Sequence, residues 1–105
     1  MDQLREDLGD GPVREVVATF FDRTPATLAE LRAAASRNDV EAIRRTAHAV
    51  KGTSATLGAK RLADECAELE RMTRSGDVPD ATARVSAVEA SYHAAKAALE
   101  AEIKP

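Results

Sequence analysis

Apolar side chains recur every three or four residues through four long stretches of this 105-residue chain, and this spacing most constrains its fold. Residues three and four apart share one face of an α-helix, so each stretch predicts an amphipathic helix with one buried stripe. The regular positions run from Val13 to Ala35, Val40 to Leu57, Leu62 to Met72 and Ala81 to Leu99. No stretch shows the two-residue alternation of a half-buried strand. The pattern therefore predicts an all-α fold.

Short turn signals separate these stretches. Asn38 can adopt a left-handed conformation after one helix, and Asp39 can cap the next. Pro25 predicts a kink over residues 21–25, rather than a complete break, because it lacks an N–H donor and its ring clashes with the preceding turn. The helices are expected at residues 2–8, 12–37, 40–57, 59–74 and from about Pro79 onward. Short connections between long helices predict an antiparallel up-down-up-down four-helix bundle, with the short N-terminal helix at one end.

Length and composition favour one helical domain over residues 1–105. The net charge is −3 with both signs interleaved, which gives no strong attraction to nucleic acid or to an anionic membrane. The single cysteine, Cys66, excludes an intramolecular disulfide and fits a reducing compartment. No apolar run approaches the roughly 18 residues of a membrane span, and no signal segment is visible. These features predict a cytoplasmic domain.

Residues 46–58, which read TAHAVKGTSATLG, contain the most informative local pattern. They place His48, Lys51 and Gly52 within about one helical turn. A glycine inside a helix costs roughly 0.5–1 kcal/mol relative to alanine, so its presence predicts a need for space beside the histidine. At about 100° per residue, His48 falls roughly 130° from the centre of the buried stripe, on the flank or outside of the bundle. Free imidazole is largely neutral near pH 7, and its lone pair can attack phosphorus.

This segment closely resembles the signature of histidine phosphotransfer (HPt) domains, whose pattern is roughly Ala-His-x-Leu-Lys-Gly-Ser-x-x-x-x-Gly-Ala. Residues 47–59 match it with two mild changes, Val50 for the usual leucine and Thr53 for a common serine. The resemblance continues where the family often has Leu-x-x-x-Cys-x-x-Leu-Glu, at Leu62, Cys66, Leu69 and Glu70. It covers most of the chain, because the flanking helix pattern also fits.

The resemblance implies that His48 accepts a phosphoryl group, on the ring nitrogen far from the backbone, from a receiver-domain phosphoaspartate. It then passes the group to another receiver aspartate in two-component phosphorelay signalling. Lys51 is expected to offset phosphoryl charge, by on the order of 1 kcal/mol at a solvated site, and Gly52 to leave room for the group. The expected partners are response-regulator receiver domains and a hybrid sensor histidine kinase, and the domain is expected to be a monomer.

The chain shows neither a glycine-rich phosphate loop nor an acidic cluster suited to Mg²⁺. We therefore expect a phosphoryl carrier and not an enzyme, with no ATP site and no intrinsic cofactor. The family's division of labour places Mg²⁺ on the partner receiver domain.

A docking surface is expected around His48, because the second helix carries more apolar positions than one stripe requires. The candidate partner-binding residues are Leu4, Leu8, Val13, Val16, Arg44, Arg45 and Ala55. For Arg44 and Arg45, simple exposure to solvent explains a charged side chain about as well as contact with a partner does. Glu65, Glu68 and Glu70, with Arg71, are predicted to form a solvated helix face, and His93 is predicted to be a surface residue.

Two alternatives remain open on the sequence alone. One is the phosphorylatable N-terminal domain of a chemotaxis-type histidine kinase, which a continuation of the gene into a kinase domain would reveal. The other is a non-catalytic helical interaction domain with an inert His48, which phosphoramidate formation would exclude.

Overall fold

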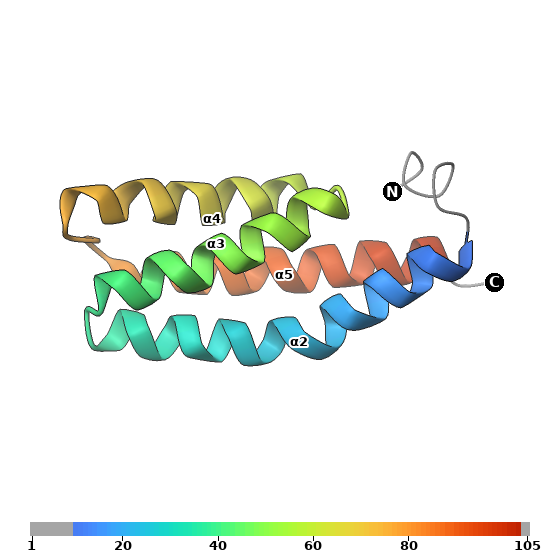
Figure 1. Ribbon diagram of the computed structural model, residues 1–105, viewed down its shortest axis with the longest axis horizontal. Helices are drawn as coiled ribbons and strands as arrows, with labels where there is room; N and C mark the ends of the chain where they lie inside the picture. The colour runs from blue at the N-terminus through green and yellow to red at the C-terminus, as the bar shows by residue number, and fades with distance from the viewer. Residues whose placement is uncertain (1–9, 104–105) are drawn as a thin grey trace.

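A computed structural model describes residues 10–103, and the regular structure in that range is entirely helical (Figure 1). The helices are α2 (Asp10–Ser36), α3 (Val40–Thr56), α4 (Lys60–Met72), the short 3₁₀ helix η1 (Thr73–Ser75) and α5 (Ala81–Ile103). The all-α prediction is confirmed. The helix predicted over residues 2–8 lies outside the described residues.

The four long helices lie side by side and reverse direction at each connection, which confirms the predicted antiparallel bundle (Figure 1). Helix α3 packs against α2 and α4, and α5 packs against the same two helices from the other side. Helices α3 and α5 therefore occupy diagonal corners. The outer face of α3 is left open to solvent along its length.

The turn between α2 and α3 follows the prediction closely. Asn38 has a φ of 54°, in the left-handed region, and so ends α2. The side chain of Asp39 accepts a hydrogen bond from the backbone N–H of Ala42 at 3.1 Å, which satisfies a free donor in the first turn of α3. Gly58, with a φ of 75°, allows the chain to turn directly from α3 into α4.

The connection between α4 and α5 differs from the prediction. Helix α4 tightens into η1 at Thr73, and Gly76, with a φ of 84°, ends that turn. Helix α5 begins at Ala81 instead of near Pro79, because Asp80 has a φ of 56° and a left-handed residue cannot extend a right-handed helix.

Helix α2 is continuous across Pro25, as predicted. Figure 1 shows that it changes direction between its first turns, in blue, and its later turns, in cyan. Pro25 accounts for the bend, because a proline within a helix removes one hydrogen bond and crowds the preceding turn. Phe20 before it and Leu28 after it are both buried in the core.

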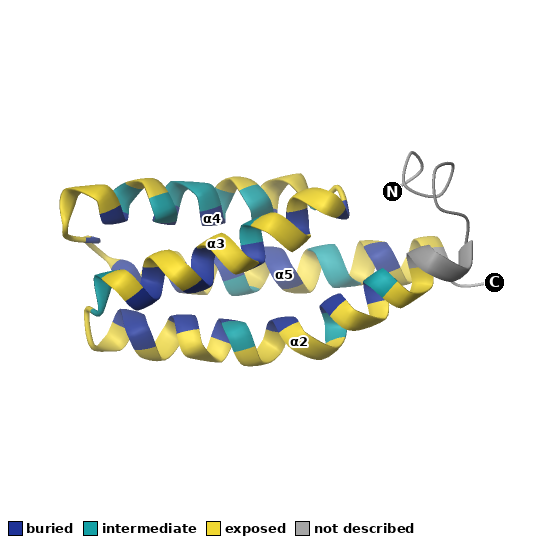
Figure 2. Ribbon diagram, in the orientation of Figure 1, coloured by how far each residue is buried: buried dark blue, intermediate teal, exposed yellow. Residues whose placement is uncertain are grey.

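The predicted apolar stripes form the core, and Figure 2 shows their buried positions turned toward the bundle interior. Val16 and Phe21 pack half-buried at its edge, as the widened stripe of α2 predicted. Burial raises the pKa of the Cys66 thiol to about 12, so this side chain behaves as a small apolar group. The largest fully buried side chains are Phe20, Leu31, Ile43, Leu57, Leu62 and Leu69.

Two buried hydroxyl groups of α3 are satisfied within their own helix. Ser54 donates to the carbonyl of Val50 at 2.6 Å, and Thr46 donates to that of Ala42 at 2.7 Å. Such bonds to the preceding turn let small polar residues occupy buried helix positions without an unpaired donor.

Two polar links join neighbouring helices at the surface. The guanidinium of Arg32 on α2 donates to both carboxylate oxygens of Glu89 on α5, at 2.9 and 2.5 Å, and to Ser86 at 2.9 Å. On the other side of α5, Ser91 donates to Glu65 of α4. These contacts fix α5 relative to both helices that it touches.

Candidate functional site

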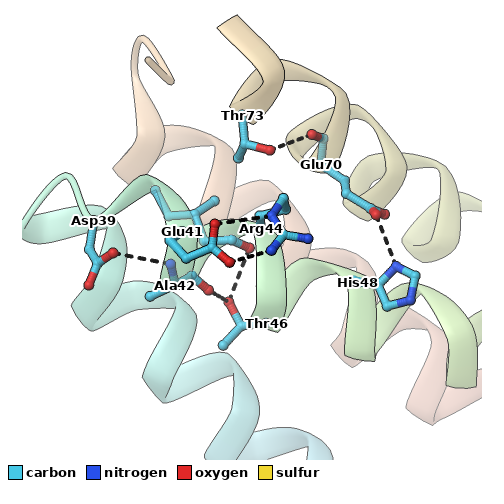
Figure 3. Close-up of polar contacts among 9 residues, drawn as sticks. Asp39, Glu41, Ala42, Arg44, Thr46, His48, Glu70 and Thr73 are labelled. Carbon is cyan, nitrogen blue, oxygen red and sulfur yellow. Dashed lines mark hydrogen bonds and ion pairs between the residues drawn. The ribbon is translucent and has the colours of Figure 1, made fainter. Parts of the chain in front are cut away.

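His48 lies midway along α3 with its side chain 66% exposed (Figure 3). The residues one position before it and two positions after it, Ala47 and Val50, are buried in the core. The ring therefore points away from the bundle interior, and the predicted position on the outside of the bundle is confirmed.

A carboxylate from the next helix holds this imidazole. The Oε2 atom of Glu70, on α4, lies 2.9 Å from Nδ1 of His48, and its Oε1 atom lies 2.6 Å from Nζ of Lys51. The Glu70 side chain is only 17% exposed. Figure 3 shows it reaching from α4 toward the imidazole on α3. Two side chains one helical turn apart thus converge on a single carboxylate.

The ionisation of Glu70 settles which nitrogen of His48 carries a proton. The hydrogen bond from Lys51, and then that from His48, hold the pKa of Glu70 below its ordinary value against the opposing effect of desolvation. An ionised carboxylate can only accept, so Nδ1 of His48 must be the donor. In the neutral ring, the lone pair then belongs to Nε2, on the side away from Glu70.

The prediction that Glu70 belongs to a solvated helix face is wrong. Glu68 does point outward and pairs with Arg71 at the surface. Glu70 instead lies one helical turn after the fully buried Cys66, a spacing that directs it toward the flank of α4 facing α3. The four-residue interval from Cys66 to Glu70 can be read from the sequence. It places Glu70 beside His48 only once α3 is known to pack against α4.

The space beside His48 is open. An added Cβ at Gly52 would meet no atom within 4 Å beyond its own helix surroundings, and Ala55, one turn further on, is exposed. Lys51 is 34% exposed and stays folded toward Glu70. The face of α3 around the imidazole therefore carries small side chains, with the ammonium of Lys51 at its edge.

The other predicted partner-binding residues are spread around this face. Arg44 is exposed and pairs with Glu41 on its own helix, whereas Arg45 is exposed and has no ion pair within residues 14–102. Val16 lies half-buried on α2. Leu4 and Leu8 lie outside the described residues, and so does the side chain of Val13.

The described residues contain neither a cluster of metal ligands nor a helix suited to a membrane. Between residues 10 and 103, no three His, Cys, Asp or Glu side chains are grouped closely enough to hold a metal ion. Within the same range, none of the helices combines the length and apolarity needed to cross a membrane.

Comparison with known proteins places this geometry in a family context. The Hpt domain family model matches residues 15–98. Sensor protein TorS of Escherichia coli (strain K12) is 32% identical over 96 residues, which is 87% of this chain but only 10% of TorS. The crystal structure of histidine-containing phosphotransfer protein B (HptB) from Pseudomonas aeruginosa PAO1 is 31% identical, with a TM-score of 0.87, and the match covers 97% of this chain and 88% of that one.

Proposed function

The chain belongs to the Hpt domain family of histidine phosphotransfer domains, and on this premise we propose that His48 is its phosphoryl-accepting residue. The observation that supports this assignment most is the exposed imidazole whose Nδ1 is held by Glu70. This arrangement leaves Nε2 open to a partner, and it fixes the tautomer that has its lone pair there.

The transfer step follows from this arrangement. The Nε2 lone pair attacks the phosphorus of an aspartyl phosphate on the partner, and an N–P bond forms. The bond from phosphorus to the aspartyl oxygen breaks, and the carboxylate leaves with the electron pair. The ring becomes a cation that keeps its proton on Nδ1, where the Glu70 carboxylate stabilises it. The same step in reverse passes the phosphoryl group to a second aspartate.

Lys51 and Gly52 are proposed to assist and not to react. The ammonium of Lys51 can offset phosphoryl charge from the edge of the site, by on the order of 1 kcal/mol where water screens it. Gly52 keeps the surface beside the ring free of side-chain atoms. Neither residue supplies a bond-forming atom, so loss of either should slow transfer without abolishing it.

In this proposal the domain is a cytoplasmic, monomeric phosphoryl carrier and not an enzyme. It needs no ATP site or cofactor of its own, and Mg²⁺ resides on the partner. Its partners are response-regulator receiver domains and a hybrid sensor histidine kinase. The docking surface would extend over Val16 on α2 and Ala55 on α3, with Leu4, Leu8 and Val13 contributing from the N-terminal part of the chain.

Phosphoryl transfer from a phosphorylated receiver domain tests the proposal directly. The wild-type domain should acquire a phosphate that is labile in acid and stable in base, as a phosphoramidate is. His48→Gln should acquire none while retaining the thermal unfolding curve of the wild type, because the residue is at the surface. His93→Gln, at the exposed second histidine on α5, is the matched control and should accept normally. An inert wild-type domain, or a fully active His48→Gln variant, would exclude the proposed role and favour a purely structural interaction domain.

A further inference from the structure

The ammonium of Lys51 lies on the side of the His48 ring opposite to the proposed phosphoryl position. Its Nζ atom is 2.6 Å from Oε1 of Glu70, and Oε2 of the same carboxylate is 2.9 Å from Nδ1 of the ring. A phosphoryl group on Nε2 would lie across the ring from this carboxylate. Lys51 would therefore have to leave Oε1 of Glu70 in order to contact it.

Phosphorylation changes the charge balance of these three side chains. In the unphosphorylated domain, the ionised carboxylate of Glu70 is matched by the ammonium of Lys51, and a neutral His48 adds no charge. A phosphoryl group adds about two negative charges near neutral pH and three acceptor oxygens. One ammonium then has two anions beside it. Because a lysine ammonium is a compact charge on a flexible stem, it can move between them by rotation of its own side chain.

Another cation is near enough to compensate Glu70 when Lys51 moves. Arg44, four residues before His48 on α3, pairs with Glu41 on its own helix (Figure 3). The pKa of Arg44 is raised by the hydrogen bond with Glu41 and, to a smaller extent, by the charge of Glu70. The guanidinium therefore already interacts electrostatically with Glu70, so this carboxylate keeps a positive neighbour after the lysine has left.

We propose that Glu70 and the phosphoryl group on His48 compete for Lys51, so that Glu70 limits how strongly this lysine stabilises the phosphorylated domain. This inference rests on the proposed phosphotransfer function and adds to it a residue that sets the transfer equilibrium. In transfer, the P–O bond to the receiver's aspartate is exchanged for the N–P bond at Nε2. A carrier must also release the group to a second aspartate, and competition for Lys51 keeps the two directions close in free energy.

A double-mutant cycle distinguishes competition from cooperation. If Glu70 instead oriented Lys51 toward the phosphoryl group, the coupling between the two residues would have the opposite sign. A panel of purified receiver domains is first screened for phosphoryl exchange with the wild type, and one that exchanges is used as the probe. The equilibrium constant for transfer to the domain is then measured for the wild type, Lys51→Ala, Glu70→Gln and the double variant. The cycle separates the interaction of the two residues from their individual effects on His48.

The effect of removing Lys51 should depend on Glu70. In the Glu70→Gln background, Lys51→Ala should lower the equilibrium constant by about fivefold, because the ammonium is then free to act on the phosphoryl group. In the wild-type background it should lower the constant by about twofold or less, since loss of the pair with Glu70 offsets part of the gain. Lys51→Gln keeps a donor for Glu70 without the charge. It should give the same pattern, and it replaces Lys51→Ala if thermal melts show that variant to be unfolded.

Lys60 and Asp64 provide a matched control. They form a lysine–carboxylate pair at 2.8 Å on α4, and Lys60 lies nearly three helical turns before Glu70. Lys60→Ala should leave the equilibrium constant unchanged in the wild type and in Asp64→Asn. NMR gives a second measurement that does not depend on the equilibrium. On phosphorylation of the wild type, the ¹⁵Nζ resonance of Lys51 should shift, and that of Lys60 should not.

An equal effect of Lys51→Ala in both backgrounds would overturn the competition, and a larger effect in the wild type would show cooperation instead. An unchanged Lys51 resonance on phosphorylation would also overturn it, because the ammonium would then have stayed with Glu70. Coupling of the same size in the Lys60–Asp64 cycle would show that the effect is not specific to the site. A wild-type domain that exchanges with no receiver would overturn the proposed function itself, and the competition with it.

Discussion

Glu70 on α4 and His48 on α3 are joined by a 2.9 Å contact between Oε2 and Nδ1, so the orientation of the imidazole depends on how these two helices pack. The packing is firm, because Cys66 and Leu69, which lie one turn before Glu70 and directly before it on α4, are fully buried. The exposed ring is therefore positioned by a residue anchored next to the core and not by its own helix alone.

Glu70→Gln should reduce the rate of phosphoryl transfer by about tenfold, which corresponds to about 1.4 kcal/mol of lost stabilisation. The neutral amide stabilises a ring cation less than a carboxylate does, and its NH₂ group can donate to Nδ1 and favour the wrong tautomer. Single-turnover transfer gives the rate, and ¹⁵N chemical shifts of the labelled imidazole report which nitrogen carries the proton.

Glu68→Gln provides the control for this experiment. Glu68 lies on the same helix and also pairs with a cation, Arg71, but it is remote from the imidazole. It should transfer at the wild-type rate with an unchanged tautomer. If the ¹⁵N shifts of Glu70→Gln matched those of the wild type and its rate were normal, Glu70 would not be a positioning residue.

The same carboxylate should contribute stability that depends on pH. Its pKa in the folded state lies below the ordinary 4.5, because Lys51 and then His48 donate hydrogen bonds to the ionised form. A depressed folded-state pKa stabilises the fold above the unfolded-state value and loses that effect as the pH falls through the folded-state value. The difference in unfolding free energy between wild type and Glu70→Gln should thus shrink as the pH falls from about 5 to below 4.5. Urea denaturation across this range measures it, and a difference that grew over the same range would contradict the sign.

The bundle could be predicted from the sequence because each helix displays its buried stripe in its own spacing. Asn38 and Asp39 were equally readable, since their side chains favour the conformations found there. The start of α5 was not readable. Asp80 takes its left-handed conformation because the chain must turn between η1 and α5, and no local preference of aspartate requires it.

This strained turn yields a comparison of two substitutions at one position. Asp80→Gly should be more stable than Asp80→Ala by about 1 kcal/mol, because glycine adopts a positive φ freely and alanine does not. Both variants lose the carboxylate, so its contribution cancels in the comparison. Thermal and urea unfolding supply the two values.

Asp77, three residues earlier, gives the internal reference because it does not have a positive φ. There the alanine variant should be at least as stable as the glycine variant, since glycine has more conformational freedom to lose on folding. The same order at both positions would argue against strain at Asp80.

The candidate site was partly predictable for a related reason. His48, Lys51 and Gly52 fall close together along one helix, so their proximity follows from the sequence spacing alone. The contact from Glu70 joins residues 22 positions apart and exists only because α3 and α4 pack antiparallel.

Substitutions at Gly52 should affect the stability of the helix and the rate of phosphoryl transfer in opposite directions. Because an added Cβ meets nothing within 4 Å, Gly52→Ala and Gly52→Gln should both raise the unfolding free energy, by roughly 0.5–1 kcal/mol. Gly52→Gln should nevertheless transfer phosphoryl groups more slowly than the wild type, since its longer side chain can occupy the space beside His48. Gly52→Ala should retain most of the wild-type rate, because a single methyl group does not reach as far.

Ala97→Gln places the same side chain on an exposed position of α5, the helix diagonal to α3, and should leave the transfer rate unchanged. Thermal melts and single-turnover transfer should be measured on the same preparations of all three variants, so that stability and rate can be compared directly. The expected pattern is a gain in stability with a loss of rate for Gly52→Gln alone. If Gly52→Gln transferred at the wild-type rate, the open surface beside His48 would not be needed for the reaction, and the glycine would be incidental to it.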